Sequence, residues 1–266
     1  MKKNVTIITG ACGGLGKAFC REIARLGDDL VITGTNLERT KANAEELMRE
    51  FEGITVKFFK LDLAQEEDRN QFFKWLQSEE IVANRLINNA GYIAEGALLD
   101  FDDETVKKVV RVNCEGTVDL TQKFIKMYGN DLEILTVSSL GAFYPMPYMS
   151  IYSSTKRMLE ALMVALRYEV KDKNIKVSTL CPGGIPTTQA MKDAIKTQGL
   201  SGKLSAKSPE YIAKYAIKKL RKNKAIIIPG AFNKFLHFIG KLAGETFTAK
   251  TVGSRWVEAN KKREVK

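Results

Sequence analysis

Short apolar runs alternate with longer amphipathic segments along most of this chain of 266 residues. Runs rich in Val, Ile, Leu and Phe are typical of strands that are buried on both faces of a parallel sheet. We expect such strands at residues 5–9, 29–34, 55–62, 85–91, 131–138, 175–180 and 225–230. Helical periodicity between them predicts an α/β fold, in which a doubly wound parallel sheet carries helices on both faces.

A glycine-rich turn, TGACGGLG from Thr9 to Gly16, follows the first expected strand and precedes a helix expected from about Leu15 to Leu26. A glycine turn between a strand and a helix allows backbone N–H groups to approach a pyrophosphate at the start of the helix. The spacing is GxxxGxG, which differs from the commonest dinucleotide fingerprint, GxGxxG. The order of strand, turn and helix therefore favours a single Rossmann-type domain that binds a dinucleotide.

Tyr152 and Lys156 are four residues apart in a segment expected to be helical up to Val170, so both side chains leave one face of that helix. A nearby ammonium favours the phenolate, so we expect Lys156 to lower the pKa of Tyr152 and make it a general acid/base. Ser139 closes the strand expected at 131–138 and could hold a substrate oxygen. The alternative is a solvated Tyr–Lys pair on a helix surface.

The composition excludes several other enzyme classes. A single histidine, His237, leaves no Ser-His-Asp triad and no histidine-rich metal site, so we expect no metal. Four scattered cysteines lack metal or redox spacing and indicate buried, reduced thiols. The first residues lack the apolar core of a signal peptide, and no apolar run approaches the ~18 residues of a membrane span. We therefore expect a cytoplasmic protein.

The net charge of +11 is compatible with attraction to nucleic acid, to an anionic membrane or to an anionic substrate. Basic and acidic residues are interspersed on most expected helices, which favours a solvated surface, and we expect no nucleic-acid partner. The basic excess is concentrated at residues 214–224 and 261–266.

Several motifs together resemble the short-chain dehydrogenase/reductase family over residues 5 to about 230. They are TGACGGLG at 9–16, NNAG at 88–91, Asn113 in VNCEGTVDLTQ, Ser139, YSSTK at 152–156 and PGGIPT at 182–187. The resemblance implies a NAD(P)-dependent alcohol dehydrogenase or ketone reductase with Asn113, Ser139, Tyr152 and Lys156 as catalytic residues, where Asn113 holds a water that links Lys156 to solvent. The cofactor contacts that it implies come from Gly10, Cys12, Gly13, Gly14, Leu15, Gly16, Gly34, Thr35, Asn36, Arg39, Asp62, Leu63, Asn89, Ala90, Gly91, Tyr152, Lys156, Pro182, Gly183, Ile185 and Thr187.

The end of the second strand favours NADP(H), although NAD(H) is also compatible. An acidic residue there would repel a 2′-phosphate, and this chain has Gly34 followed by Thr35 and Asn36, with Lys17 and Arg39 within reach. The arginine usual in the family at position 35 is missing. Asp62 matches the family's contact to the adenine edge, and it also suits the N-cap of a helix from Ala64 onward.

Aromatic residues between Ser139 and Tyr152 predict a pocket for a bulky hydrophobic substrate, with Phe143, Tyr144 and Tyr148 as candidate contacts. With the basic charge, this favours a hydroxysteroid of the bile acid type. A 3-oxoacyl thioester is the alternative substrate. A catalytically silent dinucleotide sensor or scaffold is the alternative of another class.

We expect residues 1–230 to form the dinucleotide-binding and catalytic domain, and residues 231–266 an amphipathic extension of it. Residues 188–208 indicate a substrate lid or an ordinary surface helix. Residues 232–242 could pack on the pocket or on a neighbouring subunit, lie on a membrane surface, or fray. Helices expected near 102–128 and 152–170 are apolar on several faces, and in the family such helices form an interface, so we expect a homodimer or homotetramer.

Overall fold

Seven parallel strands form one sheet at the centre of the protein. The computed structural model describes residues 4–264, with 241, 255, 256 and 258–264 described for the backbone alone. The sheet order is β3-β2-β1-β4-β5-β6-β7, and every neighbouring pair is parallel. The strands are β1 (Val5–Ile8), β2 (Asp29–Gly34), β3 (Val56–Lys60), β4 (Arg85–Asn88), β5 (Glu133–Val137), β6 (Lys176–Leu180) and β7 (Ile226–Ile227). The predicted doubly wound fold is confirmed. Several strands are shorter than expected, and the last one is shortened most.

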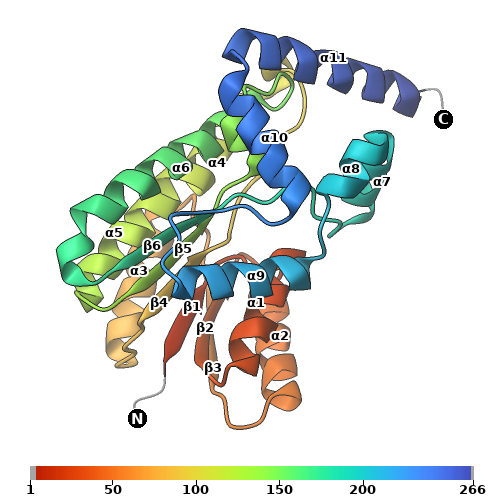
Figure 1. Ribbon diagram of the computed structural model, residues 1–266. Coiled ribbons are helices and arrows are strands. Elements are labelled where there is room, and N and C mark those ends of the chain that lie inside the picture. The colour runs from red at the N-terminus through yellow and green to blue at the C-terminus, as the bar shows by residue number, and fades with distance from the viewer. Residues whose placement is uncertain (1–3, 265–266) are drawn as a thin grey trace.

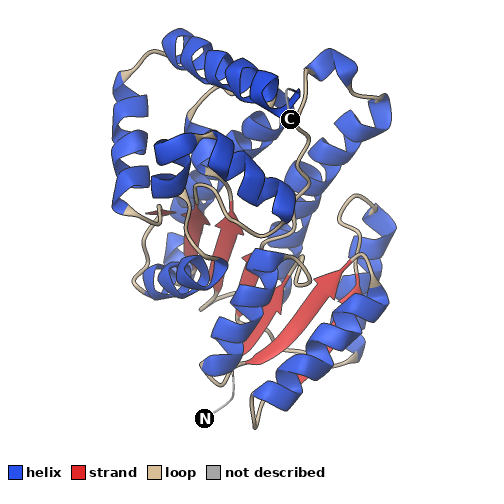
Figure 2. Ribbon diagram, turned by 90° about the vertical axis from the view of Figure 1, so that its right-hand side faces the viewer, coloured by secondary structure: helices blue, strands red, loops and turns tan. Residues whose placement is uncertain are grey.

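Helices cover both faces of the sheet (Figures 1 and 2). One face packs against α1 (Gly14–Arg25), α2 (Leu37–Glu50) and α9 (Pro209–Arg221) around the fully buried Phe19. The opposite face packs against α3 (Glu66–Ser78), α5 (Thr117–Tyr128) and α6 (Ser150–Glu169) around Phe72 and Phe124. Each helix buries one apolar stripe, so the helical periodicity is explained by this packing.

A π-helical turn interrupts the helix that the sequence predicted near 102–128. The segment consists of α4 (Asp103–Val110), the π turn η2 (Arg111–Gly116) and α5. Such turns insert one extra residue per turn and occur frequently at functional sites. Asn113 lies in this turn and is completely buried.

Most of the remaining elements lie at the end of the sheet where the strands finish. They are the 3₁₀ turns η1 (Leu98–Asp100) and η3 (Leu140–Phe143), and the helices α7 (Gln189–Thr197), α8 (Gly199–Ser205), α10 (Ala231–Leu242) and α11 (Glu245–Glu264). The 3₁₀ turn η4 (Lys171–Lys173) lies at the opposite end, before β6. In Figure 1, α10 and α11 lie at the upper end of the molecule and the N-terminus at the lower end. Within the described residues, every helix is too short or too polar to cross a bilayer.

Candidate active site

The strand order reverses between β1 and β4, and this reversal brings the glycine turn beside the turn after β4. Ile8 pairs with Ile32 on one side and with Ile87 on the other. Loops at such a switch point diverge and leave a crevice at the carboxyl ends of the strands, where dinucleotides bind. The predicted cofactor and catalytic residues therefore face one edge of the sheet.

Hydrogen bonds join the glycine turn to Asn89 and Ala90. The Thr9 hydroxyl accepts bonds from the backbone N–H groups of Asn89 and Ala90, at 3.1 and 3.0 Å. The Asn89 side chain donates to the carbonyls of Thr9 and Gly10, at 3.0 and 3.1 Å. Gly10 has φ +65°, which a side chain would disfavour, and its neighbour Ala90 leaves no room for one.

The glycines leave a cradle that suits a pyrophosphate. A side chain at Gly16 would overlap the Gly10 carbonyl, and one at Gly14 would overlap Thr187. Gly13 is the N-cap of α1 and supplies no side-chain acceptor, so the first N–H groups of the helix can bind an anion. Cys12 is half-buried with its sulfur 3.4 Å from the Thr40 hydroxyl, and Leu15 is buried in the core. These residues fit a dinucleotide.

The surface at the end of β2 carries the groups that the sequence predicted to choose the cofactor. Gly34 is buried and packs closely on Thr40, so a side chain at this position would overlap the Thr40 hydroxyl. Thr35, Asn36 and Arg39 are exposed, and the side-chain oxygen Oδ1 of Asn36 caps α2 by accepting from the Arg39 N–H at 2.8 Å. The Lys17 ammonium lies 3.8 Å from Glu46, so part of its charge is already balanced.

Asp62 caps a tight turn before α3 rather than the helix itself. Its carboxylate accepts from the N–H of Ala64 at 2.9 Å, and the helix begins at Glu66 with Gln65 as N-cap. The predicted N-cap role at Ala64 is therefore wrong by two residues. The reason is that an Asp side chain bonds readily to the N–H two positions ahead and closes a turn of its own.

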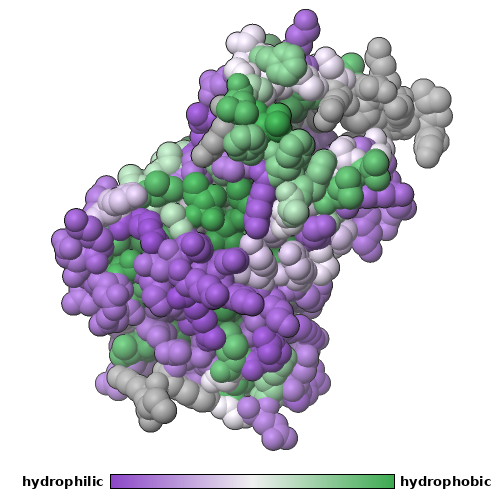
Figure 3. Space-filling model, viewed as in Figure 1, coloured by the Kyte–Doolittle hydropathy of each residue, from purple (hydrophilic) through white to green (hydrophobic). Residues whose placement is uncertain are grey.

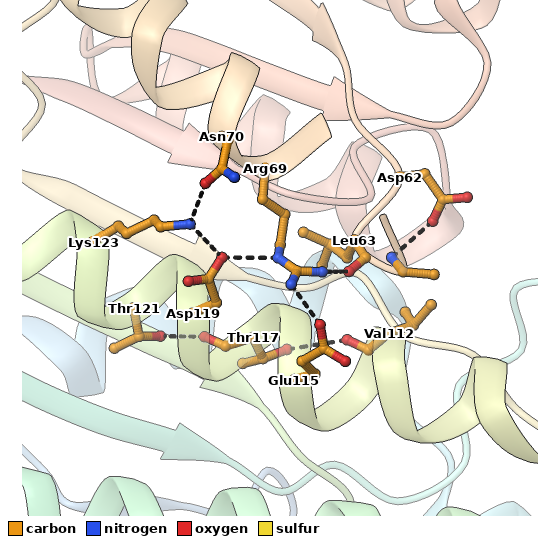
Figure 4. A network of polar contacts seen from close by, with 11 residues as sticks. Asp62, Leu63, Arg69, Asn70, Val112, Glu115, Thr117, Asp119, Thr121 and Lys123 are labelled. Atoms are coloured by element: carbon orange, nitrogen blue, oxygen red, sulfur yellow. Dashed lines mark hydrogen bonds and ion pairs between the residues drawn. The ribbon is translucent and has the colours of Figure 1, made fainter. Parts of the chain in front are cut away.

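A buried arginine links the Asp62–Leu63 turn to the π turn (Figure 4). Arg69 donates to the Leu63 carbonyl at 2.6 Å and forms ion pairs with Glu115 and Asp119, at 2.5 and 2.8 Å. Gly116 packs so closely on Leu63 that a side chain there would overlap its carbonyl. Sequence reasoning missed this contact, because residues 69, 115 and 119 carry no local signal of their pairing.

Asn113 connects the π turn to the elements on either side of the site. Its amide oxygen accepts from the Tyr92 N–H at 2.7 Å, and its amide nitrogen donates to the Tyr92 carbonyl and to the Thr155 hydroxyl, at 2.9 and 3.0 Å. A side chain at Gly91 would come within 3.4 Å of the Asn113 oxygen and 3.3 Å of the Lys156 nitrogen. Asn113 and Lys156 thus border the same space beside Gly91.

Ser139, Tyr152 and Lys156 converge where β5 meets α6. The Ser139 side chain lies close enough to the Tyr152 phenol to oppose the rise of its pKa. The Ser139 oxygen also accepts from the Gly141 N–H at 3.0 Å, which leaves its O–H free to donate. The Lys156 nitrogen donates to the Val137 carbonyl at 2.9 Å and lies 5.8 Å from the centre of the Tyr152 ring.

The predicted lowering of the Tyr152 pKa is wrong. Burial raises the pKa of this phenol above its ordinary value of 10.0, and the Ser139 side chain opposes the rise only in part. Burial also lowers the pKa of Lys156 from 10.5 to about 8, although the nearby thiols of Cys114 and Cys181 act in the opposite direction. The Lys156 nitrogen bonds a carbonyl instead of the phenol, so desolvation dominates both groups.

The PGGIPT segment closes the site from the side of β6. The Pro182 carbonyl accepts from the Leu140 N–H at 2.8 Å, and the Thr187 N–H donates to the Ile185 carbonyl at 2.8 Å. Thr187 lies against Gly14 of the glycine turn, and Gly183 lies against Ser205 and Asn233. Of the predicted cofactor residues of this segment, Thr187 therefore lies against the glycine turn, whereas Gly183 packs on α8 and α10.

Helix α10 covers the predicted substrate segment. The His237 ring lies 4.0 Å from the Phe143 ring. A side chain at Gly240 would overlap Tyr144, and burial raises the pKa of the Tyr144 phenol. Tyr148 has φ +64° and borders a hollow of about 630 Å³, together with Pro147 and with Ala249, Gly253 and Val257 of α11. One face of 232–242 therefore packs beside the substrate segment, while Phe235, Phe238 and Leu242 on the same helix are exposed.

Three of the four free cysteines are buried, as expected, and Cys12 is half-buried. Among the described residues, no three acidic, histidine or cysteine side chains converge as metal ligands would.

The model of the short chain dehydrogenase family matches residues 4–199, which is most of the chain. The chain belongs to the short-chain dehydrogenase/reductase family. This family membership makes the protein an oxidoreductase with a dinucleotide cofactor.

Individual relatives are more distant. The 3-oxoacyl-[acyl-carrier-protein] reductase FabG of Aquifex aeolicus is 30% identical over 223 residues, which are 80% of this chain and 88% of the relative. The 17-beta-hydroxysteroid dehydrogenase type 3 of Mus musculus is 30% identical over 211 residues, 77% of this chain and 66% of the relative. A short-chain dehydrogenase from Sphingobium yanoikuyae, solved with NADPH, superposes with a TM-score of 0.75 at 24% identity and covers 86% of this chain and 88% of its own.

Proposed function

We propose that this protein interconverts a secondary alcohol and a ketone on a bulky hydrophobic substrate with NADP(H), and that the substrate is a hydroxysteroid of the bile acid type. The observation that carries this proposal is the convergence of Ser139 and Tyr152 beside Lys156, at the edge of the sheet where the glycine turn lies. When bound, the nicotinamide supplies or accepts the hydride at the substrate carbon.

Tyr152 is the general acid/base in this proposal. Its raised pKa keeps the phenol protonated at neutral pH, so it donates a proton to the carbonyl oxygen as the ketone is reduced. Ser139 donates a hydrogen bond to the same oxygen, since its own oxygen is already held by Gly141. Two hydroxyl donors then stabilise the charge that develops on this oxygen.

Lys156 and Asn113 support the proton donor. The Lys156 ammonium, held by the Val137 carbonyl, holds the nicotinamide ribose and supplies positive charge near the phenol. Asn113 fixes the backbone of Tyr92 and the Thr155 hydroxyl around the space beside Gly91, where a water can link Lys156 to solvent.

The preference for NADP(H) rests on the end of β2. The buried Gly34 brings no carboxylate to the adenosine ribose, and Thr35, Asn36 and the Arg39 guanidinium are exposed beside it. A 2′-phosphate gains from a nearby guanidinium and loses from a nearby carboxylate. The solved NADPH complex of a structural neighbour is consistent with this preference.

The substrate class rests on the aromatic residues Phe143 and Tyr144, against which α10 packs. We propose that 188–208 acts as the substrate lid, that 231–266 extends the catalytic domain, and that the protein is a homodimer or homotetramer. Val110 and Met158, exposed on α4 and α6, support such an interface.

A 3-oxoacyl thioester is the second candidate substrate, because an acyl-carrier-protein reductase is among the relatives.

An absorbance screen of NADPH and NADH oxidation tests the proposal with a panel of steroid ketones, 3-oxoacyl thioesters and aromatic ketones. We expect turnover with NADPH and a steroid ketone. Preferential turnover of the acyl thioesters would select the second candidate. No oxidation of either cofactor with any ketone, while the cofactor still binds, would contradict the proposal and indicate a silent dinucleotide sensor.

A further inference from the structure

The charge of this protein is divided sharply along the chain. Residues 1–187 contain 24 basic and 26 acidic residues, whereas residues 188–266 contain 18 basic and 5 acidic residues. The C-terminal part therefore carries more than the whole excess of +11. Of its acidic residues, Glu245 is paired with Arg157 of α6 and Asp193 with Lys196, so neither of these pairs involves a lysine of α9.

Exposed apolar side chains gather on the same part of the molecule. On α10, Phe235, Phe238 and Leu242 are 58, 60 and 71% exposed and, with Ile239, form one outward stripe at helical spacing. Phe247 of α11 and Leu200 of α8 are also exposed, at 68 and 73%. Figure 3 shows green side chains over α10 at the upper end and purple side chains over α9 below it. Large exposed apolar patches of this kind mark interaction sites.

A basic hollow of about 340 Å³ lies between α9, β7 and α10, beside this stripe. Its walls include Lys219, Lys224 and Lys234. The ammonium groups of Lys219 and Lys234 lie 5.3 and 5.8 Å from the centre of the same Tyr215 ring. Among the residues that the structure describes, none of these three lysines forms an ion pair with an acidic side chain. Like charges held around one ring attract an anion.

We infer that the face formed by α8, α10 and the start of α11, with the lysines of α9, docks the protein on an anionic lipid bilayer. Apolar residues at the level of the acyl chains and lysines at the level of the phosphates are the combination that such surfaces retain. A second copy of the chain would bring the same positive charge to the contact, and a nucleic acid would leave the phenylalanine stripe unused. The inference concerns a surface and does not depend on which ketone is reduced.

Sedimentation with vesicles tests this inference on the full-length protein. The probes are vesicles of phosphatidylcholine alone and of phosphatidylcholine with an equal part of phosphatidylglycerol. We expect binding to the anionic vesicles that weakens as salt rises, and little binding to the neutral ones. Phe235→Ser combined with Phe238→Ser should weaken binding about tenfold. Lys219→Gln combined with Lys224→Gln should weaken it about fivefold for each lysine.

Matched controls lie at the opposite end of the molecule. Tyr168→Ser removes an aromatic residue that is 71% exposed on α6, and Lys171→Gln with Lys173→Gln removes two exposed charges from η4. These variants should bind vesicles like the wild type. The inference is overturned if the wild type stays in solution with anionic vesicles at low salt, or if the double phenylalanine variant binds them as the wild type does. It is also overturned if the phenylalanine substitutions only dissociate a dimer, as measured by analytical ultracentrifugation, and leave vesicle binding unchanged.

Discussion

Replacing the buried Lys156 by methionine should stabilise the fold at neutral pH. The side chain is 4% exposed, and its pKa of about 8, in place of 10.5, corresponds to a cost of roughly 3 kcal/mol for burying the ammonium. Methionine has a similar length and no charge. It also leaves the Val137 carbonyl without its donor at 2.9 Å, which costs about 1–2 kcal/mol. The net gain expected in the free energy of unfolding at pH 7 is about 1–2 kcal/mol.

The pH dependence of this gain has a definite sign. Below pH 8 the lysine is protonated in both folded and unfolded chains, so the wild type carries the full cost. Between pH 8 and 10.5 the folded protein releases the proton that the unfolded chain retains, and the stability of the wild type rises relative to the variant. Urea unfolding at several pH values measures the difference, with Lys171→Met as an exposed control. A variant less stable than wild type at pH 7, or a difference that is the same at pH 7 and pH 10, would refute the reasoning.

Three further outcomes follow from the site. Arg69→Met should lower the free energy of unfolding by about 2–4 kcal/mol in urea titrations, because Glu115 and Asp119 lose a buried partner; an unchanged midpoint would rule this out. Arg39→Glu should raise the KM for NADPH at least tenfold and leave that for NADH nearly unchanged, and equal effects on both would speak against a 2′-phosphate contact. Ketone reduction should fall as pH rises through about 8, where Lys156 loses its charge; a flat profile to pH 10 would contradict that assignment.

The sequence predicted the layers of the fold because its signals are local. Apolar strands, the Gly10–Gly16 turn and the spacing of Tyr152 and Lys156 each depend on neighbouring residues, and the sheet order places them together. Ser208 and Pro209 are another local signal of this kind, because they begin α9 as the N-cap and the first helical residue.

The predictions that failed or were missed depend on contacts between distant residues. The pKa of Tyr152 is decided by its burial, which spacing on a helix does not reveal. Arg69 reaches Glu115 and Asp119 across about 50 positions of sequence, and the π turn at Asn113 follows from packing rather than from helix propensity. The contact of α10 with Phe143 likewise joins segments almost 100 residues apart.

The most direct test of the proposed chemistry is Tyr152→Phe, which removes one hydroxyl and keeps the ring. NADPH binding, measured by the fluorescence of the bound cofactor, should remain close to that of the wild type, because the glycine turn and Lys156 are unchanged. Turnover of a ketone that the wild type reduces should fall by at least 10²–10⁴-fold, as expected when a general acid is lost. Turnover near the wild-type rate, with intact binding, would contradict Tyr152 as the proton donor and the proposed mechanism with it.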